Sequence, residues 1–463
     1  MRMRLWLAVV AALTGGVGML GGGLARPAAA QTPLPVGPQA LANVTLTGNQ
    51  DEAAVAIDPN GNFLVVWSDE FLDGSASAIV GRRFSARTGQ PLSGEILINV
   101  TTAGDQRNPA VAMADDGRFV VVWESSAIAP VVTADIYGSL RAANGAAIVA
   151  EFQVNTVTTG LQRRPAVAMQ PGGAFLVAWQ DNAPTPGRVD TGENVVGRLY
   201  PANFPSAPPG NPVLLNTGLD GDQEQPAVAA RPAVGGWLVG WQGPRLFSPP
   251  IPSILVRLLD NAGGGTNEFE VNTSQTADLR AHAALAANGQ GDAIVVWEAP
   301  DATYRGIFGR RFVGGVASGN EERINLTTGL DEREPSVAID QYGGFVTVWV
   351  VASPAETSAW QEEPEGSPII IQGRKKSGTG GFAGPGDPRV PPPDGEFQVN
   401  SSGSAFLDPW VAAEPSGNFV VAWQGSDAAD PQGNGVFYRG FRDALFADGF
   451  ESHDTTRWST TVP

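Results

Sequence analysis

Hydrophobic and polar positions follow one another along this chain in a unit that is written seven times. Residues 109–123 show it most clearly: a run of small apolar residues, a polar turn at 115–117, and a bulky apolar run that ends in Trp123. The corresponding tryptophans, separated by 56, 56, 62, 56, 52 and 74 residues, are Trp67, Trp123, Trp179, Trp241, Trp297, Trp349 and Trp423. Self-similarity at a period of this length predicts a repeat architecture.

Two other positions keep register with each tryptophan. Fourteen residues before it, or fifteen before Trp241, stands proline or a small residue: Ala53, Pro109, Pro165, Pro226, Ala283, Pro335 and Pro409. About ten residues earlier again stands an asparagine: Asn43, Asn99, Asn155, Asn216, Asn272, Asn325 and Asn400. No tryptophan run precedes Asn43, whereas the last tryptophan run is followed by no such asparagine. The N-terminal segment therefore completes the last unit.

One unit predicts four short strands. In the second unit we expect them at 110–112, 119–123, 135–141 and 151–155, with glycine-containing turns at 116–117, 144–145 and 159–160. Successive side chains of 119–123 point to opposite faces, and all of them are apolar. The predicted sheet must therefore be covered on both sides.

Seven such units favour an all-β fold, a seven-bladed β-propeller of four-stranded antiparallel blades. Small residues suit the crowded inner strands, and the tryptophans would fill the space between blades. A sandwich needs ~100 residues, roughly two units, and seven units is an odd number; a β-helix coil is shorter than this period. We expect a propeller over 39–442, closed by a strand at 39–47 that pairs beside 436–442. Its blades would start near residues 52, 108, 164, 225, 282, 334 and 408.

The first 30 residues look like a signal peptide. Arg2 and Arg4 precede an apolar, glycine-rich run, and Ala28 to Ala30 fit a cleavage site. A membrane anchor is the alternative, although the run is short for a span of ~20 apolar residues. The net charge of −18 becomes −21 when the three arginines of this leader are removed. We expect an exported monomer, secreted, periplasmic or at the cell surface, without stable membrane insertion or nucleic acid as a partner.

Residues 151–179 carry a motif that resembles the repeats of bacterial secreted β-propeller proteins, which follow F-x-V-N-T, then P-x-V-A, then G-x-F-V-V-V-W. The match includes Phe152, Asn155, Pro165, Phe175 and Trp179. This resemblance covers about 40–442 and implies the propeller fold without implying a chemistry. The tail at 443–463 resembles a D-G-F-E-S segment found at the C-terminus of exported proteobacterial proteins. A sorting tag and a frayed or docked chain end both fit it.

The long, variable loops after the tryptophan strands favour one face of the propeller for binding, because loops on a rigid scaffold commonly carry function. That face holds repeated polar residues, and the candidate ligand-binding set is Gln106, Gln162, Gln223, Glu124, Gln180, Glu298 and Gln424. They would contact a glycan or a protein. The competing interpretation is that these side chains satisfy backbone groups where strands end.

Catalytic candidates are few. The chain has no cysteine and two histidines, His282 and His453, and it shows no phosphate loop. We assign no catalytic residue, metal or cofactor. Asp-Asn-Gly segments at 58–62 and 220–222 lack the bidentate glutamate of a calcium loop and suit hairpin turns. The sequence therefore favours a non-catalytic binding or scaffold propeller. The alternative is a glycoside hydrolase or lyase that uses paired carboxylates, with candidates at Asp69, Glu124, Asp181, Glu298 and Asp301.

Overall fold

A computed structural model describes residues 33–442, which hold no helix, so no helix of the described part could cross a membrane. The signal peptide expected at 1–30, the C-terminal tail and most of the irregular stretch at 354–394 lie outside the described residues. Within 33–442, the residues that the structure does not describe are 71, 127–132, 184–191, 219–220, 233–234, 245–251, 274–279, 302–303, 353–369, 377–394, 402–403 and 428–429.

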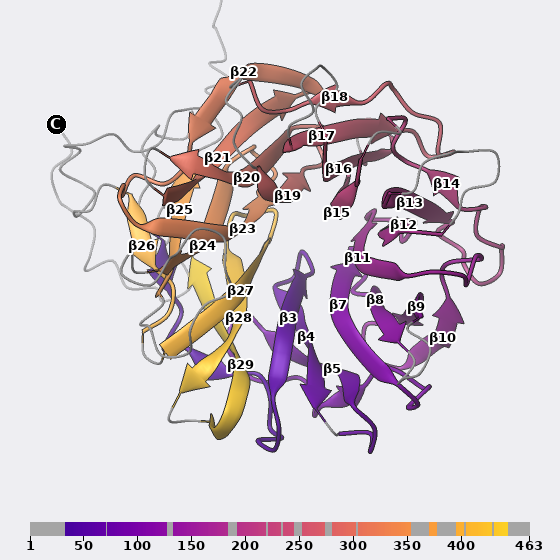
Figure 1. The fold of residues 1–463 in the computed structure, drawn as a ribbon. Coiled ribbons are helices and arrows are strands. Elements are labelled where there is room, and N and C mark those ends of the chain that lie inside the picture. The colour runs from indigo at the N-terminus through magenta and orange to yellow at the C-terminus, as the bar shows by residue number, and fades with distance from the viewer. Residues whose placement is uncertain are drawn as a thin grey trace, which may run out of the picture.

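Seven antiparallel sheets stand side by side around a central opening, as Figure 1 shows, and this confirms the predicted propeller. The innermost strands, which contact one another around the ring, are β3 (Gln50–Ile57), β7 (Asp105–Met113), β11 (Gln162–Met169), β15 (Glu224–Ala230), β19 (Ala281–Ala287), β23 (Asp331–Ile339) and β27 (Ser404–Ala413). The second strands, which carry the repeat tryptophans, are β4 (Asn62–Glu70), β8 (Phe119–Ser126), β12 (Phe175–Asp181), β16 (Trp237–Pro244), β20 (Ala293–Asp301), β24 (Phe345–Ala352) and β28 (Phe419–Asp427).

The outer half of each blade is more varied. The third strands are β5 (Ser77–Ser85), β9 (Ala134–Arg141), β13 (Asn194–Tyr200), β17 (Pro252–Leu259), β21 (Tyr304–Val313), β25 (Ile370–Lys376) and β29 (Asp430–Arg442). The fourth strands of the first six blades are β6 (Ile96–Leu97), β10 (Ala147–Gln153), β14 (Val213–Leu214), β18 (Phe269–Glu270), β22 (Val316–Arg323) and β26 (Glu396–Gln398). Several have only two residues, so most of the blade's area lies in its three inner strands.

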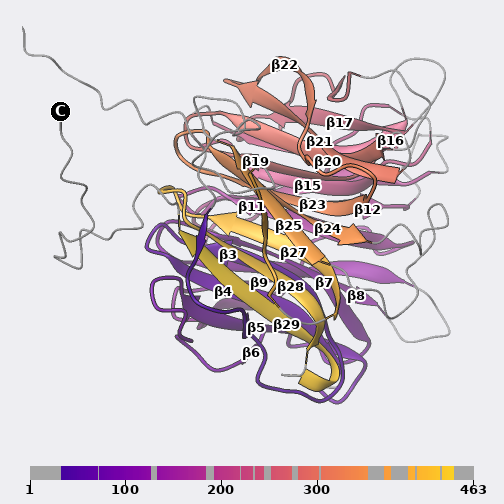
Figure 2. The same ribbon diagram turned by 90° about the vertical axis from the view of Figure 1, so that its left-hand side faces the viewer.

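The N-terminal segment closes the ring, as predicted. The short strand β2 (Ala40–Leu41) pairs with β29 through Tyr438 and Phe437, and the backbone of Ala42 continues the ladder to Val436. One feature differs from the prediction, because a second strand, β1 (Leu34–Pro35), also pairs with β29. In Figures 1 and 2 the indigo N-terminal blade lies beside the yellow C-terminal one. Closure gives the seventh blade the outer strand that the C-terminal part of the chain does not supply.

The core lies between neighbouring blades rather than within one of them. On β8, Phe119, Val121 and Trp123 pack against the first blade, whereas Val120 and Val122 pack against the third. All five are at most 1% exposed. This confirms that the second strand is covered on both faces. The seven repeat tryptophans are likewise at most 1% exposed, as expected for indoles wedged between sheets.

Each register asparagine accepts an equivalent backbone N–H, and five of them also donate to the carbonyl group two residues further on: Asn43, Asn99, Asn155, Asn216 and Asn325. In the second unit, Asn155 accepts the N–H of Ile136 at 2.8 Å and donates to the carbonyl of Val157 at 2.8 Å. The backbone N–H groups that the seven asparagines accept in this way belong to Val436, Ile79, Ile136, Val195, Ile254, Ile307 and Ile371. The side-chain amide of the asparagine thus continues the hydrogen bonding of the sheet where the fourth strand ends. This explains why the asparagine recurs in the sequence.

The register proline also has a structural reason. In every blade the pairing of the innermost strand with the second strand shifts at this point, between Arg107 and Ala110 in the second blade, for example. Such a shift is a β-bulge, where a residue does not donate to the ladder and proline is tolerated. The residue just before the proline or alanine has a positive φ in every blade, and these φ values lie between 49° and 57°.

Candidate functional site

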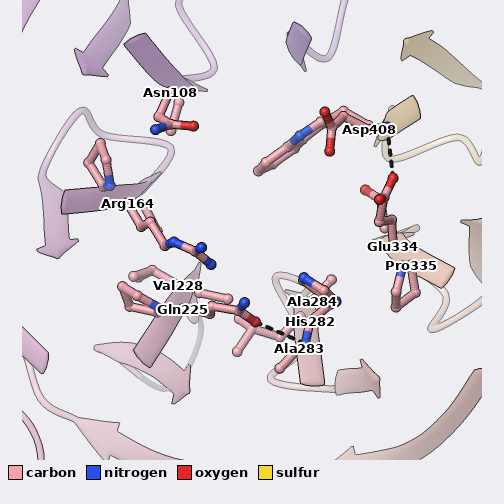
Figure 3. Close-up of a pocket in the computed structure, with 18 of the residues that line it drawn as sticks. Asn108, Arg164, Gln225, Val228, His282, Ala283, Ala284, Glu334, Pro335 and Asp408 are labelled. Carbon is pink, nitrogen blue, oxygen red and sulfur yellow. Dashed lines mark hydrogen bonds between the residues drawn. The ribbon is translucent and has the colours of Figure 1, made fainter. Parts of the chain in front are cut away.

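Seven side chains from these bulges surround the central opening. We call them the ring residues; in blade order they are Glu52, Asn108, Arg164, Gln225, His282, Glu334 and Asp408. They line a cavity of about 400 Å³ together with the small residues that follow them. The bulges lie in the first half of each innermost strand, which places the cavity toward the loop face that the sequence favoured for binding. Figure 3 shows labelled ring residues converging on it.

A positive φ is costly for a residue other than glycine, so something must hold the bulges in place. The backbone N–H of each ring residue donates to a side-chain oxygen that comes from the preceding blade. In four blades the acceptor directly follows the repeat tryptophan: Glu124 accepts from Arg164, Gln180 from Gln225, Glu298 from Glu334, and Gln424 from Glu52. These bonds tie neighbouring blades together at the centre of the ring.

In the other three blades the acceptor is itself a ring residue. Glu52 accepts the N–H of Asn108 at 2.6 Å, Gln225 that of His282 at 3.0 Å, and Glu334 that of Asp408 at 3.0 Å. The positions after the tryptophan in those blades are Ser68, Gln242 and Val350. Serine is short and valine is apolar, so in two of these blades the ring residue supplies the oxygen that this position lacks. Three ring residues are therefore committed to the architecture.

Two more ring residues are held by the buried acids described above. Asn108 donates to Glu124 at 2.9 Å, and Nδ1 of His282 lies 2.7 Å from Oε1 of Glu298. Two remain. Within the described part of the chain, the guanidinium of Arg164 and the carboxyl group of Asp408 have no hydrogen-bonding partner. Figure 3 shows Arg164 on the opposite side of the cavity from Asp408 and Glu334. These two groups are available to a ligand.

Trp410 is a departure from the repeat. The equivalent position of the innermost strand is small in the other six blades: Ala54, Ala110, Ala166, Ala227, Ala284 and Ser336. Trp410 lines the cavity and is 42% exposed, whereas the other tryptophans that the structure describes are at most 1% exposed. Burial of an indole side chain stabilises a fold, whereas Trp410 is exposed in the central opening. Stability therefore does not explain a tryptophan at this position. A flat apolar surface within a polar cavity is a platform on which a ligand can stack.

Electrostatics divide the cavity. Burial, together with the nearby charges of Glu334 and Glu52, raises the pKa of Asp408 to about 8, so its carboxyl group is protonated at neutral pH. Burial by itself lowers the pKa of His282, but its hydrogen bond to Glu298 and the charges of Glu298 and Glu334 outweigh this and raise it. The pKa of Glu298 is lowered, because His282 and Arg305 outweigh the effect of burial.

The structure places the predicted binding residues behind the cavity rather than in it. Gln106, Gln162 and Gln223 are at most 2% exposed. Gln106 and Gln162 accept from the register asparagines of their units, and Gln223 accepts the indole N–H of Trp241 at 2.8 Å. Glu124, Gln180, Glu298 and Gln424 support the bulges as described. The structure thus brings the second set next to the ring residues and keeps the first set in the blade interior.

The other acids considered from the sequence have structural partners. Asp69 and Asp181 accept the indole N–H groups of Trp67 and Trp179, and Asp301 pairs with Arg323. Asp58 accepts the backbone N–H groups of Asn60 and Asn62 within its hairpin turn. The described residues hold no group of three or more His, Cys, Asp or Glu side chains placed to bind a metal ion.

The sequence contains a signal for the ring residues. Each ring residue stands immediately before the register proline or alanine. The ring residues differ in type from one unit to the next, whereas the residue after them is proline or alanine in every unit. His282 was noted only as one of two histidines. A position whose residue type varies between units is one where the fold does not require a particular side chain.

Comparisons with solved structures agree with the fold. A fungal alcohol oxidase of the AA5 family, in complex with copper, superposes with a TM-score of 0.51 at 11% identity, over 91% of this chain and 78% of that one. A protein of unknown function from Dyadobacter fermentans gives 0.49 at 11% identity, covering 89% of this chain and 100% of that one. The GH93 α-L-arabinofuranosidase of Fusarium graminearum with arabinobiose gives 0.45 at 9% identity, covering 89% and 98%.

At 11% identity, the likeness to the alcohol oxidase concerns the fold alone. No protein-family model matches the chain. No curated protein matches it either. Any functional conclusion must therefore come from the cavity itself.

Proposed function

We propose that this protein is an exported, non-catalytic binding propeller whose ligand, the end of a glycan, enters the central cavity. The observation that carries the proposal is the exposed indole of Trp410, which stands where six blades have a small residue. Sugar rings present a flat face of C–H groups that stacks on an aromatic surface, and their hydroxyl groups need polar partners around that surface. The ring residues provide both donors and acceptors at the cavity wall.

The decisive measurement is binding of the full chain to a glycan array, followed by titration of the best ligands against tryptophan fluorescence. Trp410 is the exposed indole of the described part, so a ligand in the cavity should change its emission. Trp410→Ala should lower affinity at least about tenfold, because it removes the stacking surface. Tyr342→Ala is the matched control, since Tyr342 is also exposed, at 59%, but lies in a turn between the first and second strands of its blade.

Equal loss of binding in both variants, or no loss in Trp410→Ala, would place the ligand elsewhere.

Export is a separate part of the proposal. It depends on the leader at 1–30 and is tested by sequencing the N-terminus of the protein recovered outside the cytoplasm, where Gln31 is expected first.

A carboxylate-based hydrolase or lyase is the second candidate, and one observation favours it. Asp408 is protonated at neutral pH beside two further carboxyl groups, those of Glu334 and Glu52, in one cavity. An acid that retains its proton next to a second carboxyl group is the arrangement that glycosidases use to protonate a leaving group. Turnover of an oligosaccharide by the wild type, lost in Asp408→Asn while binding persists, would replace the binding module with this enzyme.

A further inference from the structure

The cavity has two electrically different sides. Its three carboxyl groups come from consecutive blades, the sixth, seventh and first, as Glu334, Asp408 and Glu52. Arg164 comes from the third blade, across the opening, as Figure 3 shows. His282, whose pKa is raised, comes from the fifth blade. Because the charges are separated in this way, the cavity favours a ligand that also has two differently charged ends.

The acidic side is suited to an organic cation. Trp410 follows Asp408 by two residues on β27, between the blades that carry Glu334 and Glu52. The face of an indole attracts an ammonium group, and nearby carboxylates strengthen the attraction. Of the oxygens there, those of Glu334 and Glu52 also accept backbone N–H groups, so they are held in fixed positions. A cation docking here meets a surface that is already organised.

The opposite side is suited to a carboxylate. The guanidinium of Arg164 is exposed to the cavity and has no hydrogen-bonding partner within the described residues, although the chain carries 47 acidic residues against 29 basic ones. A planar guanidinium binds a carboxylate through two parallel hydrogen bonds. A purely cationic ligand would leave this group unused, and a purely anionic one would face the carboxylates of Glu52 and Glu334.

We infer that the ligand is a zwitterion, with its ammonium group against Trp410 and the acidic side and its carboxylate on Arg164. This inference rests on the proposed function, and together they specify a sugar that carries both an amino group and an acid group. The protonated state of Asp408 agrees with this assignment: a bound ammonium group would lower the pKa of Asp408, and the carboxyl group would release its proton on binding.

The test uses the full chain and isothermal titration with five sugars: muramic acid, which has both groups, glucosamine, N-acetylglucosamine, glucuronic acid and glucose. Muramic acid is expected to bind tightest, at least about tenfold better than glucosamine, because it adds a charged hydrogen-bonded pair. Glucosamine should in turn exceed N-acetylglucosamine, which has lost the positive charge.

Two variants separate the ends of the cavity. Arg164→Gln should reduce the affinity for muramic acid to that for glucosamine and leave glucosamine unchanged. Asp408→Asn should abolish the proton release, which is measured by repeating the titration in buffers of different ionisation enthalpy. Arg118→Gln is the matched control, because Arg118 pairs with Asp116 near a turn on the opposite face.

The outcomes distinguish this inference from the proposed function. If N-acetylglucosamine binds as well as glucosamine and Arg164→Gln has no effect, the charge assignment is wrong while glycan binding stands. If no sugar binds but 6-aminohexanoate does, with sensitivity to Arg164→Gln, the two-ended cavity stands and the glycan proposal fails. If none of these compounds binds, the inference is overturned.

Discussion

Two sets of seven residues encircle this propeller, and they behave in opposite ways. The outer set, the register asparagines, is one residue type that accepts an equivalent backbone N–H in all seven blades. The inner set, the ring residues, shares a backbone conformation but contains six residue types. Identity at the outer position reflects a demand that every blade makes. Variety at the inner position shows that each blade demands only the bulge and leaves the side chain free.

The inner set also shows how a repeat can release some side chains for function. In the third and seventh blades the residue after the tryptophan, Gln180 or Gln424, supports the next bulge. The ring residues of these two blades, Arg164 and Asp408, have no hydrogen-bonding partner within the described residues. These are the two groups that we propose contact the ligand.

The largest effect is expected from breaking an outer contact. Asn155→Ala removes the bonds to Ile136 and Val157 and leaves a buried N–H without a partner. The cost should be about 2–4 kcal/mol of stability. Chemical unfolding of the full chain measures it, with Asn60→Ala, an exposed turn residue, as the control. A loss no greater than that of the control would contradict the structural interpretation of the asparagines.

An intermediate effect is expected in the sixth blade, where Glu332 occupies the position that Gln50, Gln106, Gln162 and Gln223 hold elsewhere. Glu332 is fully buried, and burial first of all raises its pKa to about 8. Its folded pKa exceeds the unfolded value of 4.5, so stability is greatest below pH 4.5 and falls as the pH rises toward 8. Glutamine cannot ionise and avoids this loss.

Glu332→Gln should therefore stabilise the protein by about 1–3 kcal/mol at pH 8 and by almost nothing at pH 4.5. The measurement is the unfolding midpoint of both proteins across this pH range. A constant difference between them at all pH values would show that ionisation of Glu332 is not the cause. A destabilised variant would mean that the glutamate has a role of its own in this blade.

The sequence was sufficient for the fold because the determinants of the fold repeat. Trp123, Asn155 and Pro165 each recur at fixed spacing, and each has one structural reason for doing so: blade packing, strand termination and the bulge. The closing strand was predicted for the same reason, from Asn43 standing without a preceding tryptophan. The pairing of a second strand, β1, with β29 was not predicted, because residues 34–35 lie before the first register asparagine and outside the repeat.

The ring residues were not predicted, because their types do not repeat. The candidate binding residues chosen from the sequence are polar residues that recur, and four of them, Glu124, Gln180, Glu298 and Gln424, support the bulges that carry ring residues. The bulge determines which backbone N–H of the next blade a side chain can reach. The hydrophobic periodicity of the sequence does not reveal where the bulge lies. Trp410 was not predicted for a related reason. It is a single departure from the small residue that the other six inner strands have at this position, and a repeat pattern does not predict a departure.

The smallest effect on stability is expected from the inner set. Arg164→Gln should change the free energy of unfolding by less than about 0.5 kcal/mol, because the guanidinium has no hydrogen-bonding partner in the described part of the chain and lies exposed in the cavity. The bulge itself would persist, since the acceptor Glu124 and the backbone N–H of residue 164 are unchanged. The same unfolding experiment that measures Asn155→Ala tests it. If instead Arg164→Gln cost as much as Asn155→Ala, the ring residues would be part of the architecture after all, and the contrast between the two sets would no longer identify the ligand-facing groups.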